Sequence, residues 1–410
     1  MSPSLSLMMF LQFFIWGALF STIAVYMSAH GMVDLTHWPY TVNPVAAIIS
    51  PFFLGLVADR YFAPERILGW LHILAGGVML LVPRAVDSPL LFILLLLAYN
   101  ICYMPTLGLV NAITFHRIED REAQYPLIRV FGTVGWIAAG LFISFVLGLF
   151  TSGVIPEETA WPLYTTGIAG LVMGLYSFTL GRTPPAAAGR KASLRSVIGL
   201  DALQELGSRS FYLFILSALL LCIPLAFYYN FTQIYLGATG FTNIAGTQTL
   251  GQFSEVFLML CMPFFFRRLG VKRMLLIAMA AWIVRYGLFS LGAPDALWTL
   301  IVTGIILHGI CYDFFFVTAH VYMDQQATPA NRGQAQGLFV LVSSGLGMLI
   351  GAQIAGRVYN AFLGSTGSLS LSDWQVFWIL PAALVILVLI LFAAGFKAEM
   401  SSSGQKRPSG

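Results

Sequence analysis

The sequence predicts an all-α integral membrane protein with twelve transmembrane helices, arranged as two halves of six helices each. Hydrophobic residues make up 58% of the 410 residues and charged residues only 9%, whereas a soluble domain carries roughly 45–50% apolar and about 25% charged residues. Twelve mostly apolar segments also approach or exceed the length of about 20 residues that a membrane-spanning helix needs. A transmembrane β-barrel would instead show alternating segments of about ten residues.

The predicted helices begin and end near Pro, Gly or charged residues. In chain order they span residues 4–29, 37–58, 67–84, 88–115, 126–150, 160–181, 210–236, 244–266, 273–291, 296–323, 334–361 and 374–396. The first segment follows no basic stretch and precedes no cleavage site with a soluble domain, so we expect a retained helix. Trp161, Trp298 and Trp374 lie near helix ends, where we expect them to anchor the protein at the membrane interface.

Lys and Arg residues are distributed unevenly between the two sides of the predicted membrane domain. The even-numbered connections and the C-terminal tail hold 17 of them, whereas the odd-numbered connections hold one, Arg84. Because cytoplasmic loops are enriched in Lys and Arg, we expect both termini on the cytoplasmic side of a bacterial inner membrane. This distribution explains the net charge of +4 without any nucleic-acid partner.

The longest polar stretch, residues 182–209, divides the chain into two sets of six helices. We therefore expect an N-terminal half (1–181), a cytoplasmic linker (182–209), a C-terminal half (210–396) and a cytoplasmic tail (397–410). Transporters built from two related halves have this layout and bind their substrate between the halves, near the middle of the membrane.

Five charged residues fall inside the predicted helices: Arg129, Glu255, Arg285, Asp313 and Arg357. A charge in the membrane interior is costly, so each should face a partner or a water-filled cavity. A contact between helices would account for Arg285 and Arg357 as well as a ligand would. The surroundings of the other three favour a ligand site.

Polar and aromatic side chains accompany these charges at helical spacing. In the fifth helix Arg129, Thr133 and Trp136 lie at i, i+4 and i+7, on one face. The further candidate binding residues, on the seventh, eighth and tenth helices, are Tyr229, Gln252, Glu255, His308, Tyr312 and Asp313. Together these groups suit a small polar ligand that carries a ring.

The sequence offers little support for an enzyme. His308 and Asp313 match the H-x4-D pattern of membrane acyltransferases, but the accompanying glycerolipid motifs are absent, as are H-E-x-x-H, G-x-S-x-G and Walker sequences. The four cysteines lie in apolar runs without C-x-x-C spacing, which indicates neither a metal site nor a disulfide. We expect no cofactor other than the coupling proton.

Several sequence strings resemble known families. G-L-V-A-D-R-Y (55–61) resembles the signature between helices 2 and 3 of the major facilitator superfamily. The longer strings resemble the bacterial nucleoside:proton symporter family, and they include F-L-Q-F-F-I-W-G (10–17), Y-M-P-T-L-G-L-V-N (103–111), I-R-V-F-G-T-V-G-W (128–136) and L-G-Q-F-S-E (250–255). This resemblance implies a major facilitator fold and the import of nucleosides with protons.

The resemblance also implies roles for individual residues. Arg129 and Thr133 would contact the nucleoside, and Trp136 would pack on its base. Gln252, Glu255 and Asp313 match the polar residues of helices 8 and 10, and Asp59 and Arg60 would belong to a cytoplasmic gate. The sequence departs from well-known members of the family at Ala226 and Tyr229, where those members carry Gln and Asn, and His308 replaces an aromatic residue of some members.

An acid that is neutral in one state and charged in another would couple the proton to transport. Burial favours the neutral carboxyl group, and an approaching cation favours the carboxylate, so Asp313 or Glu255 would carry the proton and Arg129 would promote its release. The alternatives are a carrier of another polar solute such as a sugar or glycoside, a membrane enzyme using His308 and Asp313, and a channel. We expect a monomer in the lipid bilayer.

Overall fold

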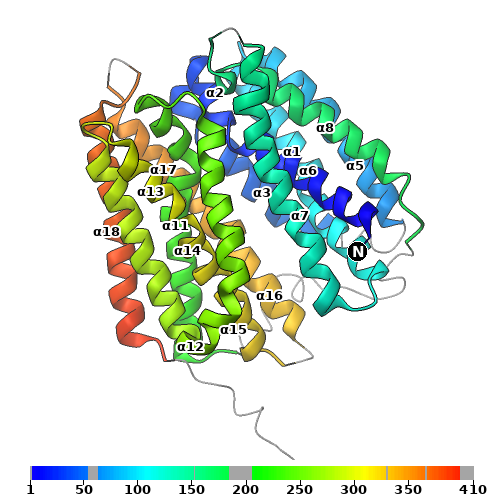
Figure 1. Ribbon diagram of the computed structural model, residues 1–410, viewed down its shortest axis with the longest axis vertical. Coiled ribbons are helices and arrows are strands. Elements are labelled where there is room, and N and C mark those ends of the chain that lie inside the picture. The colour runs from blue at the N-terminus through cyan, green and yellow to red at the C-terminus, as the bar shows by residue number, and fades with distance from the viewer. Residues whose placement is uncertain are drawn as a thin grey trace, which may run out of the picture.

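The computed structural model describes residues 2–53, 63–151, 153–183, 206–328, 331–364 and 367–397 (Figure 1). Within these residues the chain forms helices and their connections, without β-strands. The N-terminal half contains α1 (Pro3–Phe20), α2 (Ile23–Ala29), α3 (Pro39–Phe53), α5 (Pro64–Leu81), α6 (Pro89–Arg117), α7 (Arg121–Leu141) and α8 (Trp161–Ser177). The C-terminal half contains α11 (Arg209–Ala238), α12 (Ile244–Gly292), α13 (Trp298–Ile306), α14 (His308–Tyr312), α15 (Thr318–Gln326), α16 (Arg332–Val340), α17 (Met348–Phe362) and α18 (Leu371–Gly395).

The described helices account for the twelve predicted membrane crossings. Nine are long and apolar enough to span a bilayer. Among them α12 has 49 residues and breaks at Gly270, whose φ of 67° lies in the left-handed region that favours glycine. Because 49 residues would extend about 74 Å as one straight helix, α12 comprises two crossings. The shorter α3 and α8, with 15 and 17 residues, complete the set, so the predicted fold class is confirmed.

Three crossings contain π-helical turns that the apolar pattern did not predict. They are Phe142–Val146 after α7, Asp313–Val317 between α14 and α15, and Leu341–Gly347 between α16 and α17. A π-turn fits one extra residue into the helix and often occurs at functional sites. The fifth, tenth and eleventh crossings are therefore locally irregular at these turns.

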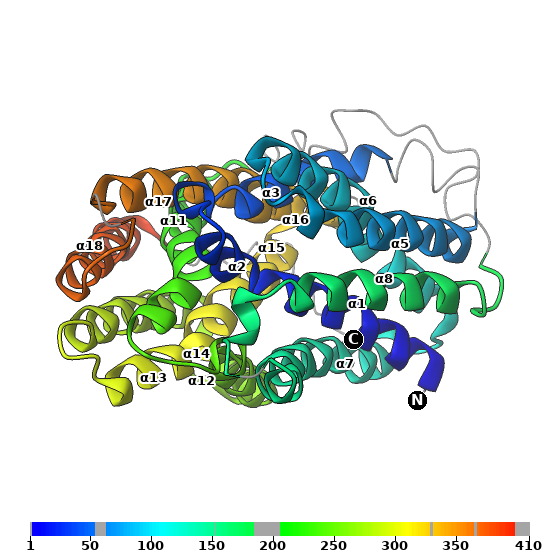
Figure 2. The ribbon, with the colours of Figure 1, turned by 90° about the horizontal axis from the view of Figure 1, so that it is seen from above.

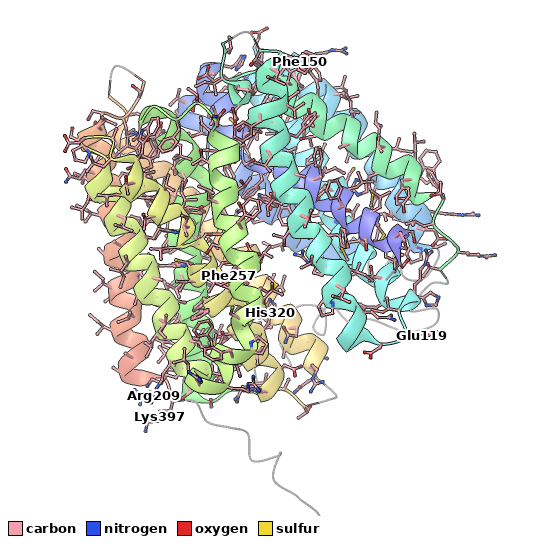
Figure 3. All side chains as sticks on the ribbon, viewed as in Figure 1. Glu119, Phe150, Arg209, Phe257, His320 and Lys397 are labelled. Atoms are coloured by element: carbon pink, nitrogen blue, oxygen red, sulfur yellow. The ribbon has the colours of Figure 1, made fainter. Side chains whose placement is uncertain are left out.

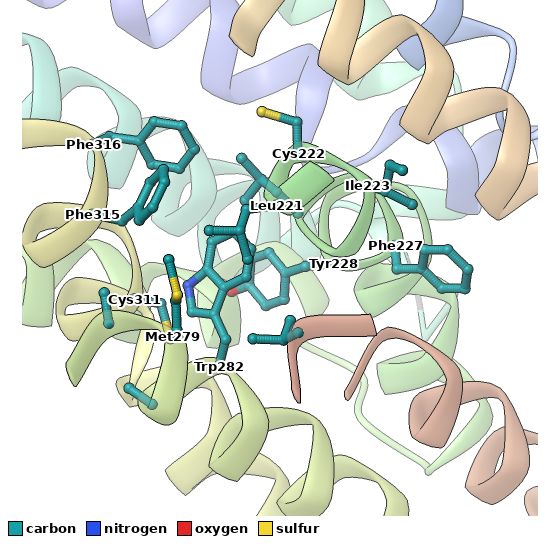
Figure 4. Packing of buried hydrophobic residues seen from close by; sticks show 14 of the residues in the cluster. Leu221, Cys222, Ile223, Phe227, Tyr228, Met279, Trp282, Cys311, Phe315 and Phe316 are labelled. Carbon is teal, nitrogen blue, oxygen red and sulfur yellow. The ribbon is translucent and has the colours of Figure 1, made fainter. Parts of the chain in front are cut away.

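Each half has its own apolar core. The larger buried cluster extends from Phe211 to Phe396 with one contribution from the other half, Val25, and Figure 4 shows part of it around Tyr228 and Trp282. The second cluster lies almost entirely between Leu5 and Leu180. Trp374 belongs to the larger core and is 1% exposed, so its predicted role as an interfacial anchor is wrong. Its ring packs against buried aromatic side chains rather than projecting toward lipid.

The two halves lie side by side (Figures 1 and 2) and meet near one end of the molecule. Hydrogen bonds that join them include Asn360 Nδ2 to the Asp34 carbonyl oxygen at 2.8 Å and Gln353 Nε2 to Thr41 Oγ1 at 2.8 Å. These contacts lie on the side that the distribution of Lys and Arg predicts to be external. We call it the external side below.

Toward the opposite end the ribbons of α7 and of α15 and α16 move apart (Figure 1). Glu119, Arg209 and Lys397 lie at this end, whereas Phe150 lies at the external side (Figure 3). The ribbons of the two halves therefore converge at the external side and diverge toward the predicted cytoplasmic side.

Candidate functional site

Arg129 is anchored in the N-terminal half by an aromatic ring and a glycine. Its guanidinium carbon lies 4.2 Å from the ring centroid of Phe13 on α1, a cation–π contact that holds the charge in an apolar setting. A Cβ atom at Gly132 would lie 2.6 Å from a terminal nitrogen of Arg129 and 2.7 Å from the Phe13 ring. Glycine at this position therefore makes room for the guanidinium between α7 and α1.

Trp136 lies two turns further along α7 and also packs against α1. Its ring is 5.6 Å from that of Trp16 and 5.8 Å from that of Phe20, and Gly17 approaches its backbone and side chain closely. The indole remains half-buried, as does Thr133 on the turn before it. The predicted face of α7 thus exists, and Trp136 keeps part of its surface available for a ligand.

An aromatic group in the C-terminal half meets this face. The ring of Tyr229 on α11 is 5.3 Å from that of Phe20 in an edge-on contact, so Phe20 touches both Trp136 and Tyr229. His308 on α14 lies 6.1 Å from Tyr229 and 5.6 Å from Tyr312, measured between ring centroids. The structure therefore brings aromatic residues of both halves to one place.

Two polar residues of α12 flank this aromatic group. Glu255 Oε2 lies 3.9 Å from His308 Nε2, and the charge of Arg129 in the other half is close enough to favour the Glu255 carboxylate. Gln252, one turn earlier, is buried, and its Oε1 has no hydrogen-bond partner among the described residues. A buried amide oxygen without a partner is unfavourable, so Gln252 is well suited to accept a hydrogen bond from a ligand.

Asp313 begins the π-turn of the tenth crossing and is fully buried. Neither carboxyl oxygen has a hydrogen-bond partner within the described part of the chain. The like charge of Glu255 also acts on it. A buried carboxylate without a partner is strongly disfavoured, so this position favours a carboxyl group that binds a proton.

The two remaining intramembrane charges differ in their surroundings. Arg285 is fully buried; its Nε donates to the Gly304 carbonyl oxygen at 3.0 Å, and its guanidinium carbon lies 4.0 Å from the Tyr228 ring centroid. Arg285 therefore stabilises the core of the C-terminal half by contacts between helices, which is one of the two roles that the sequence allowed. Arg357 is exposed.

Several residues of the site were not predicted from the sequence. The ring of Tyr228 stacks on that of His308, with centroids 5.2 Å apart and planes 17° apart. Phe20 joins Trp136 to Tyr229. The Tyr40 hydroxyl accepts a hydrogen bond from Gln233 of the other half, a residue that the sequence already marked as polar on the seventh helix. The spacing of Phe13, Trp16 and Phe20 at i, i+3 and i+7 on α1 was an available signal, although aromatic residues are abundant throughout the chain.

Among the predicted binding residues, Trp136 of one half and Tyr229 of the other both contact Phe20, and His308 and Tyr312 lie beside Tyr229 or His308 in the C-terminal half. Within the described part of the chain, Thr133 has no side-chain hydrogen bond. Asp59 and Arg60, predicted for a cytoplasmic gate, lie outside the described residues. The binding and coupling roles of individual residues remain predictions.

Comparison with known proteins identifies the family. A sequence profile described as the nucleoside H+ symporter matches residues 1–401. The chain belongs to the nucleoside H+ symporter family. It is 38% identical to YegT of Escherichia coli (strain K12), assigned as a nucleoside transporter, over 97% of this chain and 94% of that protein. It is 29% identical to the nucleoside permease NupG of the same organism, over 96% and 95% of the two chains.

The fold of the present chain matches the crystal structure of the nucleoside transporter NupG with a TM-score of 0.83 and 27% sequence identity. The match covers 96% of this chain and 98% of the NupG chain. The fold is therefore that of a multi-pass membrane transporter of the major facilitator type. The chain is a transporter rather than an enzyme, and its substrate is a small molecule.

Proposed function

We propose that the protein imports nucleosides together with protons across a bacterial inner membrane by alternating access, with both termini in the cytoplasm. Membership of the nucleoside H+ symporter family supports this function. The observation that carries it is the composition of the site. Trp136 from one half and Tyr229 from the other meet at Phe20. Arg129 carries a charge in the first half, and in the second half Glu255 lies beside His308. Asp313 is buried with no hydrogen-bond partner among the described residues.

In this proposal the aromatic residues bind the nucleobase. Trp136 and Tyr229 come from different halves and both touch Phe20, so a flat base inserted near Phe20 would contact both halves at once. Aromatic side chains stack on any base, because every base has a π-face. A ligand held by both halves favours the conformations that bring the halves together.

The polar residues would bind the sugar and orient the base. Gln252 offers a buried oxygen acceptor, Thr133 and Tyr312 carry hydroxyl groups, and Arg129 is a permanent donor. A site built to satisfy hydroxyl groups rejects ligands that lack them, since its buried polar atoms would then remain unpaired. We therefore expect nucleosides to bind more tightly than bare bases.

Asp313 and Glu255 would carry the coupling proton. Two neighbouring carboxyl groups in an apolar site cannot both ionise cheaply, so one holds a proton when the site is closed. Approach of Arg129 to Glu255 favours the carboxylate and thereby proton release. Because substrate and proton both shift one equilibrium between two conformations, a proton gradient drives the uptake of substrate.

Proteoliposomes test this function directly. An inward proton gradient should drive the accumulation of labelled uridine above the external concentration, and counterflow should saturate. Competition with adenosine, guanosine, bare bases and ribose should show that intact nucleosides compete best. Inhibition by sugars but not by nucleosides would favour a sugar or glycoside carrier, and non-saturable flux would favour a channel.

The same preparation tests the proposed oligomeric state. We propose a monomer, because the candidate site lies between the two halves of one chain. Light scattering of the detergent-solubilised protein should give one chain per particle. A stable dimer would contradict this part of the proposal.

A further inference from the structure

An acidic residue outside the membrane-spanning segments closes the external side of the molecule. Glu157 lies in the short 3-10 helix Pro156–Glu158 that precedes α8, and it is fully buried. Its Oε1 accepts hydrogen bonds from Ser144 Oγ at 2.6 Å and from the Ala245 backbone N–H at 2.9 Å. Ser144 Oγ in turn accepts from the Gly246 backbone N–H at 2.8 Å.

These hydrogen bonds join the two halves. Glu157 and Ser144 belong to the N-terminal half, whereas Ala245 and Gly246 form the first turn of α12. The first N–H groups of a helix have no partners within the helix and carry the positive end of its dipole. Asn243, the N-cap residue of α12, makes no side-chain cap hydrogen bond. The N-terminal half therefore provides the cap for a helix of the other half.

Close packing surrounds this cap. A Cβ atom at Gly246 would lie 3.0 Å from the Phe145 ring and 3.1 Å from the Ser144 Cβ. Beneath it a small cluster of buried apolar residues joins α1, α7 and α12. The cap can form only while the halves touch externally, so an outward-facing conformation must break it and expose Glu157 to solvent.

We propose that Glu157 is a second proton-binding group of the transporter, which holds the external side closed when it is protonated and releases it when it is ionised. This proposal rests on the alternating-access mechanism proposed above. It adds a proton site in a connection between helices, apart from Asp313 and Glu255.

Burial raises the pKa of Glu157 above its ordinary value, and its second oxygen, Oε2, is buried without a hydrogen-bond partner among the described residues. The hydrogen bonds from Ser144 and Ala245 and the positive end of the α12 dipole offset part of this effect. In the open conformation the exposed carboxyl group should have a pKa near the ordinary Glu value of about 4.3. The closed conformation therefore binds the proton more tightly. By linkage, closure is favoured as the external pH falls, and opening is favoured as the pH rises through the raised pKa.

Among the described residues, few other ionisable groups face Glu157. Glu158 on the same short helix adds a smaller repulsion. Of the elements packed against it, α2 and α8 contribute tyrosines, including Tyr26 and Tyr164, while the first turn of α12 and the π-turn Phe142–Val146 contain no ionisable side chain. Tyrosines do not titrate between pH 5 and 8, so Glu157 accounts for the pH response of this contact.

Spin-label distances measure the state of the external side without depending on nucleoside transport. Labels at Phe150→Cys and Leu297→Cys, which replace exposed residues of opposite halves, would be introduced into the full chain after its four cysteines are replaced by alanine. Electron paramagnetic resonance without nucleoside then gives the populations of short and long distances between pH 5 and 8. One proton changes their ratio by at most about tenfold per pH unit.

Three variants give distinct expectations. Glu157→Gln keeps the acceptor oxygen without the charge, so at pH 8 it should retain the closed population that the wild type shows at pH 5. Glu157→Ala removes the acceptor and should be more open at every pH. The matched control Glu158→Gln should behave like the wild type.

Either of two results would overturn the proposal: opening of Glu157→Gln with rising pH to the same extent as the wild type, or an unchanged closed population in Glu157→Ala. Counterflow of uridine by the same variants shows that they are folded. Failure of counterflow in the wild type would count against the transport function and not against the pH response of Glu157.

Discussion

Replacing Asp313 by Asn should abolish uphill transport while leaving the protein folded. The two side chains have nearly the same shape, and neither Asp313 oxygen has a hydrogen-bond partner among the described residues. The substitution therefore breaks no contact of those oxygens, and the free energy of unfolding should change by less than about 1 kcal/mol. What it removes is the ability to bind and release a proton at this buried position.

The effect on accumulation follows from the energy of the gradient. A gradient of one pH unit is worth about 1.4 kcal/mol per proton, so a carrier that couples one proton can concentrate its substrate about tenfold per pH unit. Asp313→Asn should bring the ratio of internal to external uridine to about one. Counterflow, which needs no net proton movement, should persist.

Uptake and counterflow in proteoliposomes measure the two quantities side by side. Asp324→Asn is a matched control, since Asp324 lies in the same crossing but forms an exposed ion pair with Arg332, with Nε and Oδ1 2.7 Å apart. This control should accumulate uridine normally. If Asp313→Asn still concentrates uridine, Asp313 is not the essential proton carrier, and Glu255→Gln becomes the variant to test.

Three further predictions concern the base, the gate and the packing of α7. Trp136→Ala should weaken uridine binding roughly 5- to 150-fold, which corresponds to the loss of about 1–3 kcal/mol of stacking, whereas Trp136→Phe should keep much of the affinity. If calorimetric titration of the Ala variant gives an unchanged dissociation constant, the stacking hypothesis is wrong. Alanine at Asp59 or Arg60 should slow transport more than it weakens binding, and a variant with normal turnover but lost affinity would contradict a gating role. Gly135→Ala should destabilise the protein by about 1–3 kcal/mol, because the new Cβ would clash with the Phe10 carbonyl oxygen on α1. An unchanged melting temperature would show that α1 and α7 can separate at little cost.

The membrane crossings could be predicted because their cause is local. Apolar length, Lys and Arg in the connections and Gly or Pro at the ends are all visible in the sequence, and α12 shows why counting works even where two helices join, since Gly270 marks the break. The π-turn at Asp313 could not be predicted in this way. Its extra residue is held by packing between helices, which periodicity within one helix does not report.

The charged residues of the site could be predicted from the sequence. Arg129, Glu255 and Asp313 stand out because the membrane interior penalises ions, and the structure brings them to one interface. Tyr228 and Phe20 did not stand out, because aromatic residues are common in this chain and only tertiary contacts distinguish the two that matter. The role of Glu157 could not be predicted for another reason. Acidic residues are common in loops, and only the folded structure shows that this one is buried.

The π-turns have a consequence for how this chain tolerates change. A single deletion within Asp313–Val317 would remove the extra residue, so the turn would become regular α-helix and the residues beyond it would keep their orientation. The buried face of α15, with Thr318 and Tyr322, would then stay against its neighbours. A deletion in a regular part of the same crossing would instead rotate everything beyond it by about 100°. The tenth crossing should therefore tolerate the loss of one residue at the π-turn better than anywhere else along its length.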